Sequence, residues 1–323
     1  MSKTLSIVLG PHGQVQDLKS GAVRVDGFDL AFTEVKRMPD VYREMARTQP
    51  YDVCEMAPTS YLMARAAGAP LTALPLPMTR RFRHGGVQRL RHSVVRQPSD
   101  LEGRAVGVRT YSVTAAVWTR GIYADEYGLD PDKVSWLTQE AENVSGFALP
   151  HNVLCVGKEK PFSDLLRAGQ LDAVFAGLAG GAEGLEDELV DLVDDAASAE
   201  RAWFERTGIY PLHGVIVVRN DVLDAHPHLP AALFDAFSEA KGNYLARVRS
   251  GEADTPEDAR YSKLATFVGD PLPYGFEENR ASFDALIRYA HRQRLIESLP
   301  ALDEVVLDPQ RATVTNTTHK VLA

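Results

Sequence analysis

The chain has 323 residues, of which 45% are hydrophobic and 24% charged, the composition of a folded globular protein rather than a disordered one. Its formal net charge of −9 argues against nucleic acid as a partner. No stretch approaches the roughly 20 apolar residues that a membrane-spanning helix needs, so we expect no membrane association. The length favours two domains over one.

The first ten residues contain a single Lys and only a short apolar run. They lack the long apolar region and the small-residue cleavage site of a signal peptide. The sequence therefore predicts a cytoplasmic protein.

Short apolar runs alternate with amphipathic segments along most of the chain, which predicts an α/β fold with parallel strands. Pro58 opens one helix, because proline is tolerated at the first helical position, and Gly68 ends it. The predicted strands are residues 6–9, 51–56, 71–76, 105–108, 134–137 and 171–175, with further extended runs at 23–35, 87–95 and 213–218. The predicted helices are residues 15–19, 41–48, 59–67, 162–168, 229–248, 256–267 and 282–293, with one more starting near Val113.

The order of these elements predicts two lobes, the second inserted into the first. Lobe 1 comprises residues 1–92 and 211–323, and lobe 2 comprises residues 93–210. The chain crosses between them twice, and the two crossing strands would form a hinge. Ligands of such proteins bind at loops that follow strand ends, so we expect a ligand cleft between the lobes.

Hydroxyl side chains gather between the predicted strand at 105–108 and the helix that follows it. Tyr111, Ser112 and Thr114 lie in this turn, and Ser112 is a suitable N-cap. The free N–H groups of a first helical turn, together with the helix dipole, attract anions. We interpret the turn as a binding site for a carboxylate, although a capped helix without a ligand has the same sequence signature.

Six segments of the chain resemble the 4,5-dihydroxyphthalate decarboxylase family, and they occur in the same order from Asp52 to Arg288. They are residues 51–56 (YDVCEM), 60–65 (SYLMAR), 83–84 (RH), 114–121 (TAAVWTRG), 206–211 (RTGIYP) and 273–280 (PYGFEENR). The resemblance implies a two-lobed, type II periplasmic-binding-protein-like fold, used in this family by cytoplasmic enzymes. It also implies removal of one carboxylate from a catechol dicarboxylate, which gives protocatechuate.

Decarboxylation of a hydroxylated aromatic ring needs a proton donor to the ring carbon and a group that assists the phenol. Histidine suits proton delivery, because its ordinary pKa of about 6.5 lies near neutral pH. His84, in one of the matching segments, is the first candidate, and His213 at the second crossing is another. Glu55 could act as a base for the phenol or orient a histidine, and an ion pair with an arginine is the structural alternative.

The candidate substrate-binding residues lie at strand ends and helix starts. His12 follows the first predicted strand, and Thr59 and Ser60 begin a helix. Arg81 or Arg83 could hold a carboxylate with two parallel hydrogen bonds. With Tyr111, Ser112 and Thr114, these residues predict a small aromatic carboxylate as the partner.

The chain has neither a glycine-rich phosphate-binding loop nor a HExxH or paired-cysteine motif. We therefore predict that it uses no cofactor and holds no metal, with a divalent metal left open because catechols chelate metals. Two other functions remain open, a cytoplasmic binding protein for a small carboxylate and a different lyase or biosynthetic enzyme on the same scaffold. A homo-oligomer is also open.

Overall fold

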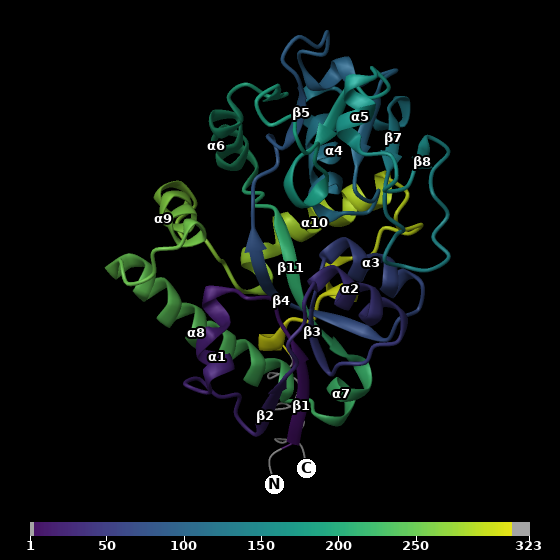
Figure 1. The fold of residues 1–323 in the computed structure, drawn as a ribbon. Coiled ribbons are helices and arrows are strands. Elements are labelled where there is room, and N and C mark those ends of the chain that lie inside the picture. The colour runs from purple at the N-terminus through teal and green to yellow at the C-terminus, as the bar shows by residue number, and fades with distance from the viewer. Residues whose placement is uncertain (1–2, 312–323) are drawn as a thin grey trace. The chain divides into compact units, whose positions relative to one another are not determined.

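The computed structural model describes residues 3–311, and these form two compact units (Figure 1). Unit 1 runs from the start of the chain to Arg80, then over Leu212–Asp284 and from Pro300 onward, and unit 2 comprises Arg81–Pro211 and Ala285–Leu299. The first boundary thus falls twelve residues before the expected one, because residues 81–92 include a strand of the unit 2 sheet. Residues 285–299 were expected in lobe 1, but they pack with unit 2.

Unit 1 is built on a five-stranded sheet with the strand order β2-β1-β3-β11-β4. Strand β1 is parallel to β2 and to β3, whereas β11 is antiparallel to β3 and to β4. All four residues of β3 are buried, which explains why its sequence is a continuous short run rather than an alternating one. The strands are β1 (Lys3–Val8), β2 (Phe28–Phe32), β3 (Val53–Met56), β4 (Leu71–Arg80) and β11 (Leu212–Arg219).

Helices of unit 1 pack against this sheet and supply much of its core. The 22 residues of α8 bury Leu229, Leu233 and Phe237 against β1 and β4 side chains, and Gly251, in the left-handed conformation at φ 80°, ends the helix. The helices are α1 (Gln16–Ser20), α2 (Met38–Arg47), α3 (Pro58–Ala66), α7 (Asn220–Ala225), α8 (Leu229–Ser250), α9 (Pro256–Val268) and α11 (Leu302–Val305). Helix α10 (Phe276–Arg292) begins in unit 1 and ends in unit 2.

Unit 2 contains a six-stranded sheet with the order β10-β5-β9-β6-β7-β8. The run β9-β6-β7-β8 is parallel, and β5 pairs antiparallel with β9 and β10. The strands are β5 (Val87–Leu90), β6 (Ala105–Val108), β7 (Ser135–Thr138), β8 (Val153–Cys155), β9 (Ala173–Phe175) and β10 (Leu189–Asp191). The helices are α4 (Thr114–Tyr127), α5 (Phe162–Arg167) and α6 (Ala196–Thr207).

The end of α10 belongs to unit 2 because it packs tightly on α4. The Tyr289 and Trp118 rings meet edge to face with centroids 5.7 Å apart. A Cβ at Gly121 would come within 2.3 Å of the Tyr289 ring, so only glycine allows this contact. Asp125 accepts a hydrogen bond from the Tyr289 hydroxyl at 2.8 Å.

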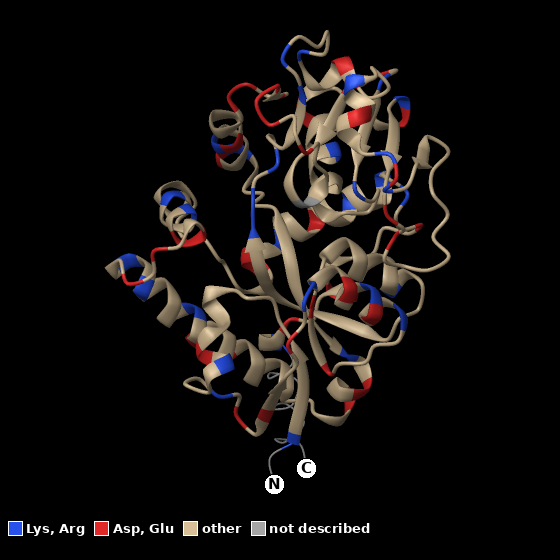
Figure 2. Cartoon of the chain, in the orientation of Figure 1, with Lys and Arg blue, Asp and Glu red and all other residues tan. Residues whose placement is uncertain are grey.

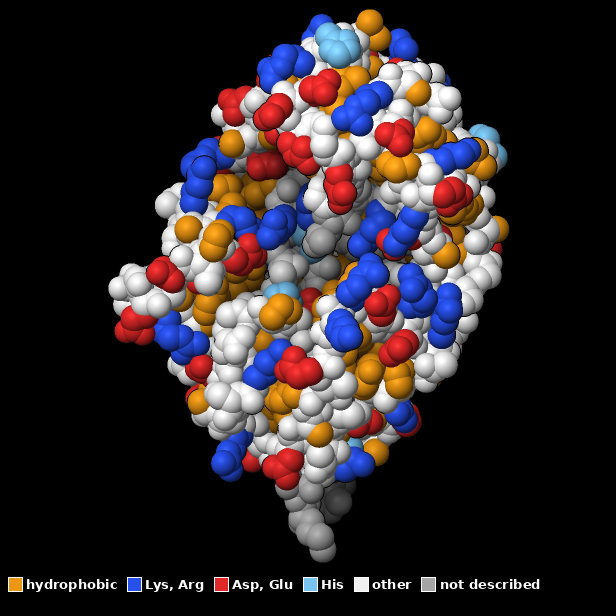
Figure 3. Space-filling model, in the orientation of Figure 1, with side chains coloured by type: hydrophobic (Ala, Val, Ile, Leu, Met, Phe, Trp, Pro, Cys, Tyr) orange, Lys and Arg blue, Asp and Glu red, His pale blue; other side chains and the backbone are white. Residues whose placement is uncertain are grey.

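Charged side chains of both signs are spread over the surface (Figures 2 and 3). The acidic stretch before α6, residues 183–195, follows an exposed path along unit 2 (Figure 2). The arginines of residues 80–96 do not form one patch, because Arg80 is 0% exposed and Arg89 is 6% exposed. Within residues 3–311, no helix is long and apolar enough to cross a membrane.

Candidate functional site

A histidine and a glutamate meet at the carboxyl ends of two neighbouring parallel strands in unit 1. His12 follows β1, and Glu55 lies in β3 one residue beyond Cys54, which pairs with Val8 of β1. His12 Nε2 lies 2.8 Å from Glu55 Oε2. The Glu55 side chain is 3% exposed and that of His12 is 18% exposed, so the pair is buried on one side and reachable on the other.

Two glycines let the Glu55 carboxylate sit against the backbone. The Gly10 N–H donates to Glu55 Oε2 at 2.8 Å, and a Cβ at Gly10 would lie 2.6 Å from His12 Nε2. On the other side, a Cβ at Gly214 in β11 would lie 2.4 Å from Glu55 Oε1. Side chains at either position would displace the pair, so both glycines are required by space.

His12 and Glu55 each shift the pKa of the other toward its charged form. Burial acts to lower the pKa of His12, but the charge and hydrogen bond of Glu55 outweigh burial, and the pKa is raised above 6.5. Burial acts to raise the pKa of Glu55, but His12 and the Gly10 N–H outweigh it, and the pKa is lowered below 4.5. The two shifts therefore favour an imidazolium next to a carboxylate over a neutral pair, and an imidazolium is a proton donor.

We expect the His12 imidazole to titrate above pH 6.5 and the Glu55→Gln variant to lower that midpoint, because burial, which lowers the pKa, is then the largest remaining effect. Imidazole proton chemical shifts followed against pH by NMR measure both values, with Asp26→Asn, an exposed carboxylate, as the control. An unchanged midpoint in Glu55→Gln would contradict the coupling.

The same shifts have a consequence for stability. The raised pKa of His12 adds to the free energy of unfolding. This stabilisation is complete below about pH 6.5 and is lost as pH rises through the raised pKa of the folded state. The lowered pKa of Glu55 also adds to the free energy of unfolding, and this stabilisation is present above about pH 4.5 and is lost as pH falls through the lowered pKa of the folded state.

The other candidates of unit 1 lie on the strands and helices next to this pair. Thr59 and Ser60 lie in the first turn of α3, directly after β3, and are 0% and 2% exposed. His213 precedes Gly214 in β11. It lies at an irregularity in the pairing of β11 with β4 and is half-buried, so its role as a catalytic residue stays a prediction.

His84 lies in unit 2, in a buried aromatic environment. Its ring is 1% exposed and packs edge to face on Trp203, with centroids 5.2 Å apart, and on Tyr127 at 6.4 Å. Burial, reinforced by Arg206, lowers its pKa to about 4. The imidazole is therefore neutral at pH 7, and this environment disfavours the role of proton donor that we expected for it.

Arg81 and Arg83 belong to the segment of unit 2 that connects β4 to β5. The Arg81 N–H donates to the Pro211 carbonyl at 3.2 Å, and the Arg83 carbonyl accepts from Thr119 Oγ1 at 3.1 Å. These backbone bonds tie the two chain crossings to unit 2. Binding of a carboxylate by either guanidinium stays a prediction.

The turn before α4 holds a carboxylate of the chain itself. Glu142, from the segment after β7, accepts hydrogen bonds from the Tyr111 N–H at 2.7 Å, from the Ser112 N–H at 3.1 Å and from the Ser112 hydroxyl. Thr114, the first residue of the helix, is 4% exposed. The carboxylate seen in this turn is thus internal, and binding of a substrate carboxylate there stays a prediction.

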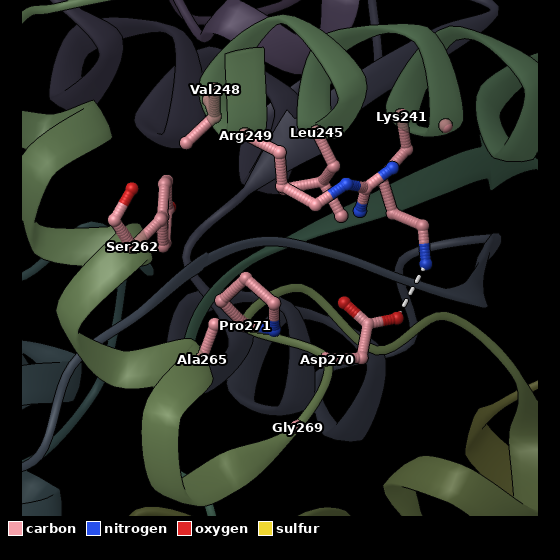
Figure 4. A pocket seen from close by; sticks show the side chains of 11 residues that line it. Lys241, Leu245, Val248, Arg249, Ser262, Ala265, Gly269, Asp270 and Pro271 are labelled. Carbon is pink, nitrogen blue, oxygen red and sulfur yellow. Dashed lines mark hydrogen bonds and ion pairs between the residues drawn. The ribbon is translucent and has the colours of Figure 1, made fainter. Parts of the chain in front are cut away.

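A separate cavity of about 620 Å³ lies in unit 1 between α8 and α9 (Figure 4). Its walls come from residues 241–271, away from the sequence-predicted site residues, and the Lys241 ammonium pairs with Asp270 at 2.7 Å across its rim. Within residues 3–311, no group of three or more His, Cys, Asp or Glu side chains that could hold a metal ion is found.

Sequence reasoning missed Gly10, Gly214 and Glu142. A glycine inside a strand is a known sign of close backbone approach, and Gly214 within 213–218 carried that sign. Nothing in the sequence connects Glu142 to a turn thirty residues earlier, because the contact depends on β6 and β7 lying side by side.

Two curated proteins resemble the chain in sequence, and no protein-family model matches it. A 4,5-dihydroxyphthalate decarboxylase of Comamonas testosteroni is 30% identical over 310 residues, which covers 91% of this chain and 94% of that protein. A protein of the same name from Pseudomonas putida is 30% identical over 179 residues, covering 53% of this chain and 69% of that protein.

In structure, the chain is similar to the periplasmic sulfonate-binding protein SsuA of Methylobacillus flagellatus KT, with a TM-score of 0.59 at 12% identity. The similarity covers 99% of this chain and 96% of that one. At this identity the likeness shows the fold, which is the type II periplasmic-binding-protein fold expected from the sequence. The sequence match over nearly the whole length shows more: the chain belongs to the 4,5-dihydroxyphthalate decarboxylase family.

Proposed function

We propose that the chain is a carboxy-lyase that removes one carboxylate, as CO2, from a hydroxylated aromatic dicarboxylic acid such as 4,5-dihydroxyphthalate. Membership of the family and the name of its full-length relative support the reaction class. The single structural observation that carries the proposal is the His12–Glu55 pair, with 2.8 Å between Nε2 and Oε2. This pair supplies the proton that the reaction consumes.

The step balances as a proton-for-CO2 exchange at one ring carbon. The phenol para to a carboxylate gives its proton to water, and the resulting phenolate pushes an electron pair toward the carbon that bears the carboxylate. His12 donates a proton to that carbon, with Nδ1 as the nitrogen left for this task because Nε2 bonds Glu55. The carbon–carboxylate bond then breaks, its electrons restore the aromatic ring as a phenolate, CO2 leaves, and the phenolate takes a proton back from water.

Glu55 acts in this proposal through His12. Its carboxylate stabilises the imidazolium before the transfer and orients the ring through one hydrogen bond. After the transfer, the negative charge of Glu55 favours return of a proton to His12, which prepares the next cycle.

The remaining roles stay proposals. The helix start at Thr59–Ser60 in unit 1 is suited to hold a carboxylate. In unit 2, Arg81 or Arg83 and the helix start at Tyr111–Thr114 are each suited to the same task. The reaction as written uses no cofactor, and a divalent metal that chelates the catechol is the alternative. Cytoplasmic location and a homo-oligomer are likewise expectations.

Incubation with 4,5-dihydroxyphthalate in D2O tests the proposal directly. We expect the product to have lost the mass of CO2 and to carry one deuterium at the vacated ring carbon, as measured by mass spectrometry and NMR. Phthalate is the control, because without hydroxyl groups it should remain unchanged. A parallel incubation with EDTA reports on a metal. Unchanged 4,5-dihydroxyphthalate together with thermal stabilisation of the protein would overturn the lyase in favour of a carboxylate-binding protein.

A further inference from the structure

The turn before α4 presents three donors to one carboxylate, an arrangement that a helix cap alone does not need. Both oxygens of Glu142 are used, one by the Tyr111 N–H at 2.7 Å and the other by the N–H and hydroxyl of Ser112. Glu142 lies outside the helix and its N-cap, in an irregular segment between β7 and β8.

A buried cation lies directly behind this turn. The Arg120 side chain is 0% exposed and donates from Nη2 to the Tyr111 carbonyl at 2.5 Å and from Nε to Gln293 Oε1 at 2.7 Å. Its guanidinium lies 4.1 Å from the Tyr111 ring centroid. Its hydrogen-bond partners among residues 3–311 are neutral, and its Nη1 has none.

Burial lowers the pKa of Arg120, and Tyr111 and then Glu142 act electrostatically against burial, Glu142 being the carboxylate of the two. The positive end of α4 and the buried guanidinium therefore both favour a negative charge at the Tyr111–Ser112 peptides. Glu142 supplies that charge here, and a ligand carboxylate carries the same charge and the same two acceptor oxygens.

The Tyr111–Ser112 turn, which donates the hydrogen bonds, is held more firmly than the Glu142 carboxylate, which accepts them. Gln293 connects Arg120 to the Val117 carbonyl, to which its Nε2 donates at 2.8 Å, and the Tyr111 hydroxyl donates to the Gln293 carbonyl at 3.3 Å. Glu142 comes from a segment without regular secondary structure and is half-buried. The Glu142 carboxylate can therefore move away, while the Tyr111 and Ser112 donors stay in place as an anion site.

We propose that Glu142 is a built-in competitor, whose carboxylate occupies the binding site for a substrate carboxylate at Tyr111 and Ser112 until the ligand displaces it. The inference rests on the proposed function for the identity of that ligand. Glu142 then sets the affinity, because a ligand binds only to the fraction of molecules in which the site is vacated.

The test measures phthalate binding by calorimetry in Glu142→Ala, Glu142→Gln and the unmodified chain. Phthalate offers the two carboxylates without the phenol that decarboxylation needs. We expect Glu142→Ala to bind phthalate roughly tenfold more tightly, since the internal competitor is gone. Glu142→Gln, which keeps the side-chain shape and loses the charge, should also tighten binding and serves if the Ala variant does not fold.

Glu140→Gln is the matched control, because Glu140 lies two residues earlier in the same segment and pairs with Lys158 at 2.8 Å instead. Its phthalate affinity should equal that of the unmodified chain. Unchanged or weakened phthalate binding in both folded Glu142 variants would overturn the proposal and leave Glu142 as a structural cap.

Different results would contradict the carboxy-lyase and the role of Glu142 as a competitor. Tightened phthalate binding without turnover of 4,5-dihydroxyphthalate would count against the lyase and support the competitor. Normal turnover with unaltered phthalate affinity in the Glu142 variants would support the lyase and count against the competitor.

Discussion

The His12→Asn variant should lose decarboxylation by about 10²- to 10⁴-fold in kcat while remaining folded. Asparagine keeps a hydrogen-bond donor for Glu55 but has no titrating nitrogen, so the pair can no longer deliver a proton. In the unmodified enzyme, kcat should fall as pH rises through the raised pKa of His12, because the imidazolium is the active form. Product formation from 4,5-dihydroxyphthalate at a series of pH values measures both effects.

Two further variants decide between His12 and His84. His92→Asn changes an exposed histidine and should leave kcat unaltered. His84→Asn removes a ring packed on Trp203, so it should lower Tm more than it lowers kcat of the folded enzyme. If His12→Asn kept full activity and a folded His84→Asn variant had none, the assignment of His12 would be wrong.

The order of strands and helices could be predicted from sequence because hydrophobic periodicity reports burial within one element. The predicted helix at 59–67 is α3 (Pro58–Ala66), and that at 229–248 is α8 (Leu229–Ser250). The strands β8 and β10 were not predicted, whereas β9, which also has three residues, was predicted within 171–175. The strand predicted at 87–95 ends at Leu90, after which a turn begins.

The residues of the site could be predicted from the sequence, but the contact between them could not. His12 and Glu55 were each singled out, one as a binding residue and the other as a base. That they meet depends on β1 and β3 being adjacent and parallel, a long-range fact that local patterns do not contain. For His84, the matching segment suggested a proton donor, whereas burial beside Trp203 and Tyr127, reinforced by Arg206, lowers the pKa of the ring to about 4.

The Gly214→Ala variant should lower both the stability of the protein and its kcat. The φ of Gly214 lies outside the left-handed region, so available space and not backbone strain decides the effect. The added Cβ would lie 2.4 Å from Glu55 Oε1 and 3.1 Å from the Met78 Cβ, so the carboxylate must move. We expect a loss of about 1–3 kcal/mol in the free energy of unfolding, as for other overpacked cores. A displaced Glu55 should also lower kcat by about 10²-fold through misplacement of His12.

Shortening the glutamate separates these two consequences. In the double variant Gly214→Ala/Glu55→Asp, the carboxylate is one methylene shorter and withdraws from the added methyl group, so part of the lost stability should return. The activity should not return, because the shorter side chain no longer reaches His12. Chemical denaturation of the four combinations gives the coupling energy, and Gly242→Ala, a helical glycine whose Cβ would meet nothing within 4 Å, is the control for the added methyl group. Additive effects of the two exchanges on stability would show that Gly214 does not act through Glu55. A favourable coupling energy between the two exchanges, with activity still absent, would show that the missing side chain of Gly214 is what allows Glu55 to contact His12.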